Sequence, residues 1–238
     1  TPVVSSAASD VYKRQCDDID APAQNFCAKF IYGKYDDKLK MQEFIKEIDV
    51  ITYEFENIPY ETLNELNKVK PVLPKPSVNR LIQHRIAEKD FVNKLNIRTT
   101  RYASIESKSD IEPLGDFLPG ILKTTTMGYD GKGQYPIKKI EEINNLNIDF
   151  SKGYILEKLV KLKKEISVII TRFGNNSYEI YEPIENTHED QILKHSIIPA
   201  QISKKIFDES KDWSIRIAEE LKLSLIHISE PTRPAIIS

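Results

Sequence analysis

The sequence predicts an α/β fold, in which short apolar strands alternate with helices that have one apolar side. Three features predict it. Residues 47–69 have the pattern of a strand, a turn and a helix, and residues 120–137 that of two strands around a glycine-rich turn. Residues 153–223 have the pattern of further strands followed by one long amphipathic helix.

The composition is that of an ordinary globular chain, with a formal net charge of −2, 40% hydrophobic and 29% charged residues. A nucleic-acid-binding chain would carry a basic excess, and this chain carries none. No run of about 18 apolar residues could span a membrane, and no secretory signal is present. Cys16, Cys27 and the four histidines lack metal-ligand spacing. We expect a cytoplasmic protein with no nucleic-acid or membrane partner and no metal ligands of its own.

The two ends of the chain differ from the middle. Residues 1–15 and 224–238 show neither helical nor strand periodicity, and the chain does not begin with Met. Both stretches resemble translated sequencing-adapter read-through. We interpret them as non-native tails around an interior fragment, residues 16–223; ordinary disordered termini are the alternative.

The first predicted strand, EIDVITYEF at residues 47–55, is an apolar, β-branched run suited to burial on both faces. A turn with Pro59 and the helical pattern YETLNELNKV follow it. Ligands of open α/β sheets bind beyond the carboxyl ends of strands, where Glu54, Glu56 and Asn57 stand. Turn and helix-cap chemistry is the alternative role for these side chains.

Prolines in KPVLPKP, residues 70–76, predict a domain boundary, because proline fixes φ and disfavours helix in the residue before it. One helix is predicted from Ser77, as its N-cap, to about Leu95. A hairpin is predicted about residues 174–176 and a last helix at about residues 203–223.

The segment TTTMGYDGKGQ, residues 124–134, holds three of the eight glycines of the chain. It lies between the strand patterns GILKTT and QYPIKKI, at the tip of a predicted β-hairpin. A Walker A loop is excluded because Lys132 is followed by glycine, and a Rossmann fingerprint because the loop joins two strands. We interpret the loop as a mobile hairpin that folds over a triphosphate, with Lys132 and Lys123 as cations. A surface turn is the alternative.

The next predicted strand, YILEKLV, ends in Glu157, followed by Lys158, Leu159 and Val160. Alternating backbone donors and acceptors beside a carboxylate suit an adenine edge and a ribose hydroxyl. A surface Glu/Lys pair is the alternative.

Five segments together carry a resemblance: DVITYEFENIP, LKTTTMGYDGKGQ, YILEKLV, KEISVII and ENTHEDQILKHSIIPA. Their order and spacing resemble the 5-(carboxyamino)imidazole ribonucleotide synthase family, over residues 16–223. The resemblance implies an ATP-grasp fold: a partial Rossmann-like domain at 16–76, linker helices and a lid subdomain at 77–160, and the start of an incomplete C-terminal subdomain at 161–223. ATP would lie between the last two.

Carried over by position, the resemblance implies ATP contacts at Arg85, Lys123, Gly128, Tyr129, Asp130, Gly131, Lys132, Gly133, Gln134, Glu157, Lys158, Leu159, Val160, Glu165 and His188. The cations Arg85, Lys123 and Lys132 suit phosphate oxygens, whereas Glu157 and Glu165 suit hydroxyl or amino donors. No catalytic residue is assigned.

His188 has an alternative role as a hydrogen-bonded turn residue within NTHED. Glu54, Asn57 and Tyr129 are the residues predicted to contact the ribonucleotide substrate. His84 precedes Arg85 where the family often has Asp, which puts the N-cap of a helix there in doubt.

The implied activity is ATP-dependent carboxylation of 5-aminoimidazole ribonucleotide by bicarbonate, through carboxyphosphate, in bacterial purine synthesis. ATP and Mg2+ are the implied cofactors and a homodimer the implied assembly. The family's first strand is missing before Cys16, and its magnesium-binding carboxylates and Asn-Glu pair lie beyond Leu223. We therefore expect this chain by itself to lack carboxylation activity.

Two other functions stay open. A formate-dependent glycinamide ribonucleotide transformylase-like ligase would share the lid but lack the Glu54-Phe55-Glu56-Asn57 run. A non-catalytic nucleotide-binding module would lack the downstream carboxylates.

Overall fold

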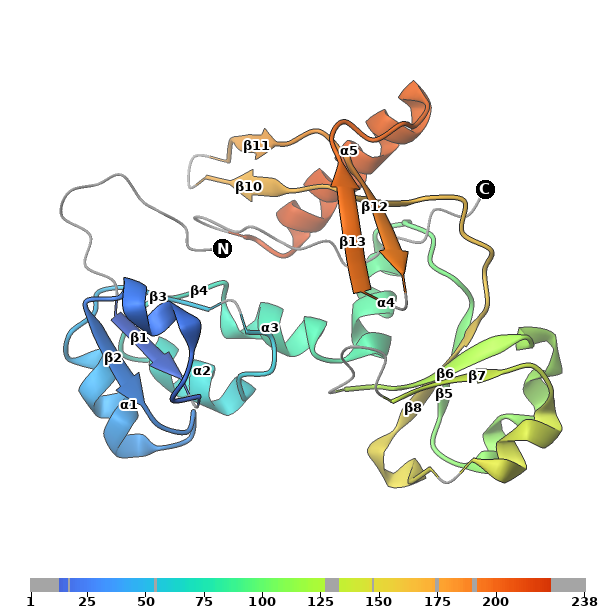
Figure 1. Ribbon diagram of the computed structural model, residues 1–238, viewed down its shortest axis with the longest axis horizontal. Helices are drawn as coiled ribbons and strands as arrows, with labels where there is room; N and C mark the ends of the chain where they lie inside the picture. The colour runs from blue at the N-terminus through green and yellow to red at the C-terminus, as the bar shows by residue number, and fades with distance from the viewer. Residues whose placement is uncertain are drawn as a thin grey trace. The chain divides into compact units, whose positions relative to one another are not determined.

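The computed structural model describes residues 13–16, 18–53, 55–126, 133–146, 148–173, 176–189 and 192–223. The chain forms two compact units, Thr1–Arg80 and Leu81–Ser238 (Figure 1). Within the described residues, no helix combines the length and the apolar character needed to cross a bilayer.

The first unit contains two parallel strand pairs, β1 (Lys13–Cys16) with β2 (Lys29–Tyr32) and β3 (Ile51–Thr52) with β4 (Val72–Leu73). The short 3-10 helix η1 (Pro22–Phe26) and the helices α1 (Lys38–Ile45) and α2 (Tyr60–Asn67) alternate with these strands. Helix α1 begins after Asp37, whose Oδ1 accepts from the backbone N–H groups of Leu39 and Lys40 at 3.0 and 3.1 Å. The order of strands and helices confirms the predicted α/β class for this unit.

Two predicted elements of this unit differ from the structure. The strand predicted at 47–55 is only Ile51–Thr52, and it is not buried on both faces, because Ile51 is buried and Thr52 is exposed. The connector predicted at 70–76 contains β4, in which Val72 is 1% exposed. The prolines on either side of β4 have no N–H group, so they limit its ladder to two residues rather than prevent it.

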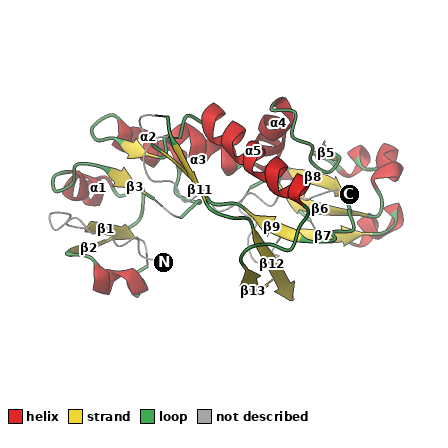
Figure 2. Cartoon of the chain, turned by 90° about the horizontal axis from the view of Figure 1, so that it is seen from above, coloured by secondary structure: helices red, strands yellow, loops and turns green. Residues whose placement is uncertain are grey.

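The second unit contains a four-stranded antiparallel sheet in the order β5-β8-β6-β7, with β5 (Tyr102–Ile105), β6 (Gly120–Thr124), β7 (Gln134–Ile137) and β8 (Tyr154–Lys158). Strands β6, β7 and β8 lie side by side in Figure 2. The β6–β7 pair confirms the hairpin predicted around the glycine segment. Four 3-10 helices accompany this sheet: η2 (Lys108–Asp110), η3 (Glu112–Phe117), η4 (Ile140–Asn145) and η5 (Phe150–Lys152).

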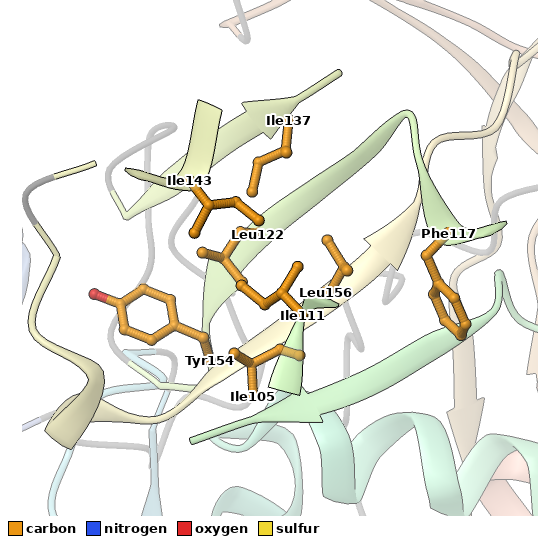
Figure 3. Packing of buried hydrophobic residues seen from close by; sticks show 8 residues of the cluster. All are labelled: Ile105, Ile111, Phe117, Leu122, Ile137, Ile143, Tyr154 and Leu156. Atoms are coloured by element: carbon orange, nitrogen blue, oxygen red, sulfur yellow. The ribbon is translucent and has the colours of Figure 1, made fainter. Parts of the chain in front are cut away.

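The core of this sheet is formed by one cluster of buried side chains from the strands and the 3-10 helices (Figure 3): Ile105, Ile111, Phe117, Leu122, Ile137, Ile143, Tyr154 and Leu156. In β8, alternate residues point to opposite faces. Tyr154 and Leu156 belong to the cluster, and Ile155 and Glu157 on the other face are buried as well. The sheet is therefore covered on both faces at β8.

The single helix predicted from Ser77 to about Leu95 is two helices, α3 (Pro76–Ile82) and α4 (Arg85–Lys94). Helix α3 begins at Pro76, whose fixed φ suits a first helical position, so Ser77 is not its N-cap. The chain is extended at His84, with φ −120° and ψ 106°, and its Nδ1 accepts from the Ala87 N–H at 3.4 Å. His84 therefore caps α4, and the doubt about a helix start at this residue was wrong.

The rest of the second unit has a three-stranded antiparallel sheet in the order β13-β12-β9, with β9 (Glu165–Ser167), β12 (Ile184–Glu189) and β13 (Ile192–Ile197). The hairpin β10 (Ile170–Arg172) and β11 (Tyr178–Ile180) confirms the one predicted about residues 174–176. Helix α5 (Lys204–Glu220) confirms the last predicted helix, with Ser203 as its N-cap. The β12–β13 hairpin was not predicted.

Candidate functional site

Two neighbouring antiparallel strands bring Lys123 and Glu157 together. Lys123 of β6 pairs with Ile155 of β8, so Glu157 lies two residues further on the same face of the sheet. The Lys123 Nζ donates to Glu157 Oε2 at 2.8 Å. The Glu157 side chain is 11% exposed and that of Lys123 is 19% exposed. This is a largely buried ion pair and not the surface pair considered for Glu157.

Helix α4 adds a second lysine to the same carboxylate. The Lys89 Nζ lies 3.4 Å from Glu157 Oε1, and the Lys89 side chain is 18% exposed. Each carboxylate oxygen of Glu157 therefore faces a different ammonium group. Sequence reasoning missed Lys89, although its position four residues after Arg85 places both side chains on one face of a helix.

The two lysines decide the charge of Glu157. Burial by itself would raise the pKa of this carboxyl, but the Coulombic and hydrogen-bond interactions with Lys123 and Lys89 outweigh burial and lower it. The carboxylate is therefore ionised at neutral pH. Two cations around one anion leave the cluster with a net positive charge in a place where water screens weakly, which favours an anionic ligand.

Arg85, the first residue of α4, joins this helix to the end of β6. Its backbone N–H donates to Thr125 O at 2.9 Å, and its Nε donates to Thr124 O at 3.0 Å. Thr125 in turn donates its backbone N–H to Gly153 O at 3.1 Å. The point where the glycine segment leaves β6 is thus held to α4 and to the residue that precedes β8.

The described base of the glycine segment requires a glycine at residue 133. Gly133 has φ +69°, and a Cβ there would lie 2.9 Å from Thr124 Oγ1. Its carbonyl accepts from the Thr124 N–H at 3.0 Å, and the next residue, Gln134, pairs with Lys123. The other predicted residues of this segment lie outside the described residues: Gly128, Tyr129, Asp130, Gly131 and Lys132. Glu54 is outside them too.

At the end of β8, several backbone N–H and C=O groups already form hydrogen bonds with other residues of the chain. Lys158 donates its N–H to Arg101 O at 2.9 Å, and its carbonyl accepts from Thr100 Oγ1 at 2.7 Å. The Leu159 N–H donates to Pro119 O at 2.9 Å, while the Leu159 side chain is 50% exposed. An adenine edge at this strand end would meet the Leu159 side chain beside Val160, and it would find both backbone groups of Lys158 and the Leu159 N–H already engaged.

Glu165 and His188 form a separate local group on the three-stranded sheet. Glu165 of β9 pairs with Asn186 of β12, and His188 lies two residues beyond Asn186. The His188 Nδ1 is 3.3 Å from Glu165 Oε2, with the two side chains 22% and 20% exposed. His188 lies in a strand, so the alternative of a turn residue was wrong. Asn57, in the first unit, is half-buried at the start of the segment that leads into α2.

In the part of the chain that the structure describes, no group of three or more His, Cys, Asp or Glu side chains could hold a metal ion. The described candidate groups are therefore two: the cluster of two lysines around one buried carboxylate, and the separate carboxylate–imidazole pair of Glu165 and His188. Such a donor set suits a polyanion with hydroxyl groups rather than a bare divalent cation.

The fold and these groups define a class of protein. A model of the ATP-grasp domain matches residues 90–226, and a model of the ribonucleotide synthetase preATP-grasp domain matches residues 4–83. The chain belongs to the ATP-grasp family. The predicted ATP-grasp fold with an N-terminal preATP-grasp domain is therefore confirmed.

More specific similarity is to N5-carboxyaminoimidazole ribonucleotide synthases. The enzyme of Bacillus subtilis (strain 168) is 34% identical over 208 residues, 86% of this chain and 54% of the relative. That of Brucella melitensis is 36% identical over 205 residues, 84% of this chain and 57% of the relative. A crystal structure of the Staphylococcus aureus enzyme complexed with ADP has a TM-score of 0.80 and 31% identity, and the match covers 87% of this chain and 56% of that one. The resemblance inferred from the sequence is confirmed, and the chain spans about half the length of these curated relatives.

Proposed function

We propose that this chain forms the nucleotide-binding part of an ATP-dependent carboxylase that adds bicarbonate to 5-aminoimidazole ribonucleotide in purine synthesis. The observation that carries the proposal is the buried cluster of Lys89, Glu157 and Lys123 beside the base of the glycine hairpin, in an ATP-grasp fold. Similarity to synthases, one of them crystallised with ADP, supports the same substrate class.

In this proposal the residues of the second unit bind and align the nucleotide. Lys123 neutralises phosphate charge, and Arg85 fixes the start of the hairpin through its two bonds to Thr124 and Thr125. Glu165 and His188 accept and orient ribose hydroxyl groups. Leu159 supplies an apolar contact for the base.

The reaction itself is a phosphoryl transfer followed by a carboxyl transfer. A bicarbonate oxygen attacks the γ-phosphorus, the bond from phosphorus to the bridging oxygen breaks, and ADP leaves. The intermediate that remains is carboxyphosphate. The amine of 5-aminoimidazole ribonucleotide then attacks the carboxyl carbon, the bond from that carbon to the phosphate oxygen breaks, and phosphate and one amine proton leave. Such chemistry asks the protein mainly for alignment and charge neutralisation, and exclusion of water protects carboxyphosphate.

Calorimetric titration of the 238-residue chain with ADP tests the nucleotide-binding part of the proposal. We expect the wild-type chain to bind ADP and Lys123→Ala to weaken binding by about 1–3 kcal/mol, because a charge-assisted contact is lost. Lys163→Ala is the matched control, since Lys163 is exposed and outside the cluster. A folded wild-type chain that does not bind ADP, or equal affinities for all three proteins, would contradict the proposal.

The carboxylation is tested in the longer protein to which such a chain corresponds. We expect ADP release that requires both bicarbonate and 5-aminoimidazole ribonucleotide, and sedimentation as a homodimer. Release that depends on formate and glycinamide ribonucleotide instead would favour the transformylase-like ligase. No release with either pair would favour a nucleotide-binding module.

A further inference from the structure

Lys89 contacts an aromatic ring as well as the carboxylate that it shares with Lys123. The Lys89 ammonium lies 3.4 Å from Glu157 Oε1 and 5.7 Å from the centroid of the Tyr102 ring. Tyr102 of β5 pairs with Glu157 of β8, so the ring stands next to the carboxylate in the sheet. Lys89 therefore lies between a negative charge and an aromatic ring, and both attract a cation.

Tyr102 is itself fixed to the helix that carries Lys89. Its hydroxyl donates to Asp90 Oδ1 at 2.5 Å and accepts from Asn93 Nδ2 at 3.1 Å. Burial and then the Asp90 hydrogen bond raise the pKa of Tyr102, so its phenol stays protonated and neutral. The Lys89 side chain is thus held in a preformed place by α4, β5 and β8 together.

Lys123 contacts the same carboxylate from β6, one residue before Thr124, at the base of the hairpin. A phosphate that drew the Lys123 ammonium away would remove the closer of the two cations around Glu157. A largely buried carboxylate without a cation is strongly disfavoured. Lys89 prevents that state, because its ion pair with the other oxygen does not depend on Lys123.

We propose that Lys89 is a positioning residue: it keeps the Glu157 carboxylate paired when Lys123 turns from Glu157 to the phosphates of a bound nucleotide. The proposal rests on nucleotide binding at this site, as proposed above. Before a nucleotide binds, the Glu157 carboxylate holds the Lys123 ammonium. After binding, Glu157 remains paired with Lys89. The net positive charge of the cluster is what makes this exchange possible.

If Lys89 is replaced by an uncharged residue, the departure of Lys123 changes the protonation state of Glu157. In Lys89→Met, the departure of Lys123 would leave Glu157 with no cation from the described part of the chain, where the groups that face it are Lys123 from β6, Lys89 from α4 and the neutral Tyr102 from β5. Glu157 would then take up a proton as the nucleotide binds. Nucleotide affinity would therefore rise as the pH falls, in addition to any dependence that the wild-type protein shows.

Calorimetry with ADP in buffers of different ionisation enthalpy tests this consequence. We expect Lys89→Met to weaken ADP binding about tenfold at pH 8 and to add about one proton taken up per ADP, relative to wild type. Lys89→Arg, which keeps the charge, should bind ADP with little added proton uptake. Lys89→Met/Glu157→Gln should also lose the added uptake, because no carboxylate remains to be protonated.

The outcomes separate this inference from the proposed function. If wild type does not bind ADP, or Lys123→Ala binds as wild type does, nucleotide binding by Lys123 is wrong and the inference with it. If Lys123→Ala weakens binding but Lys89→Met adds no proton uptake, the function stands and the role of Lys89 is overturned. Lys89→Gln serves as a second neutral variant.

A crystal structure of the wild-type chain with ADP tests the inference without any substitution that could unfold the protein. We expect the Lys89–Glu157 ion pair to persist and the Lys123 Nζ to lie more than about 4 Å from the Glu157 oxygens, the limit of an ion pair. A Lys123–Glu157 pair retained beside bound phosphates would overturn the inference.

Discussion

The four-stranded and the three-stranded sheet of the second unit are built in opposite ways. In the four-stranded sheet, residues 154–157 of β8 are all buried, between the cluster of Figure 3 on one face and the Lys89–Glu157–Lys123 cluster on the other. In the three-stranded sheet, every residue of β13 is exposed, including Ile192 at 65% and Leu193 at 51%. Strand β8 of the first sheet is covered on both faces, whereas β13 is paired with β12 and exposed along its length. The charged cluster of the first sheet therefore lies on a strand that is packed on its other face as well.

The largest expected difference is between truncations of a leucine side chain in the two sheets. Leu156→Ala removes a fully buried side chain from β8, and we expect it to destabilise the chain by about 2–5 kcal/mol. Leu193→Ala, in exposed β13, should cost no more than about 0.5 kcal/mol. Urea unfolding followed by circular dichroism measures both. Equal losses would mean that β13 is covered in solution.

A second prediction concerns the close approach at the base of the hairpin. Gly133→Ala should destabilise the chain by about 1–3 kcal/mol, because alanine resists the positive φ and its Cβ would crowd Thr124. Gly115→Ala is the control, since a Cβ there meets only Ile140 Cδ1 at 3.9 Å. Thermal unfolding of both variants checks the prediction. A neutral Gly133→Ala would show that the backbone relaxes at residue 133.

A third prediction uses pH to compare the buried carboxylate of β8 with an exposed one on β11. The pKa of Glu157 is lowered in the folded chain, so its stabilisation is present above the ordinary pKa of an unfolded glutamate and is lost as the pH falls through the folded value. Glu157→Gln should therefore flatten the acid side of the stability profile. Glu179→Gln, on an exposed position of β11, should leave the profile as in wild type. Chemical unfolding between pH 3 and 7, the range about the ordinary pKa of glutamate, provides the profile.

The smallest effect is expected at the start of α4, the helix that carries Lys89. His84→Asp should stabilise the chain by about 0.5 kcal/mol, because Asp is a better N-cap and its charge suits a helix N-terminus. His84→Ala should destabilise it by about 1 kcal/mol. Melting temperatures at constant pH distinguish the two. Destabilisation by Asp would indicate a role of His84 beyond capping.

Elements with their own local signals were predictable from the sequence. The hairpin of β6 and β7, strand β8, the hairpin of β10 and β11 and helix α5 all followed from period and turn residues. The break between α3 and α4 was not, because histidine is a rare N-cap and the helical pattern continues through His84. The β12–β13 hairpin was missed because its exposed strand carries no alternation of buried and exposed residues.

The part of the site on β6 and β8 was predictable, because its residue types point to nucleotide binding and the strand register brings these residues together. Lys123 and Glu157 were both predicted, and the antiparallel register of β6 and β8 brings them together. Lys89 was missed because its role depends on how α4 meets the sheet, which no local pattern encodes. The pairing of Glu165 with His188 likewise depends on β9 joining β12, a contact between segments about twenty residues apart in the sequence.

The bonds from Arg85 to Thr124 and Thr125 have a mechanical consequence. They attach α4 to the chain one and two residues beyond Lys123, and the same helix carries Lys89 one turn later. Helix α4 is therefore bonded to the two residues that follow Lys123 in the chain and, through Lys89, to the carboxylate that Lys123 contacts. The root of the hairpin and the charged cluster thus share one anchor, helix α4.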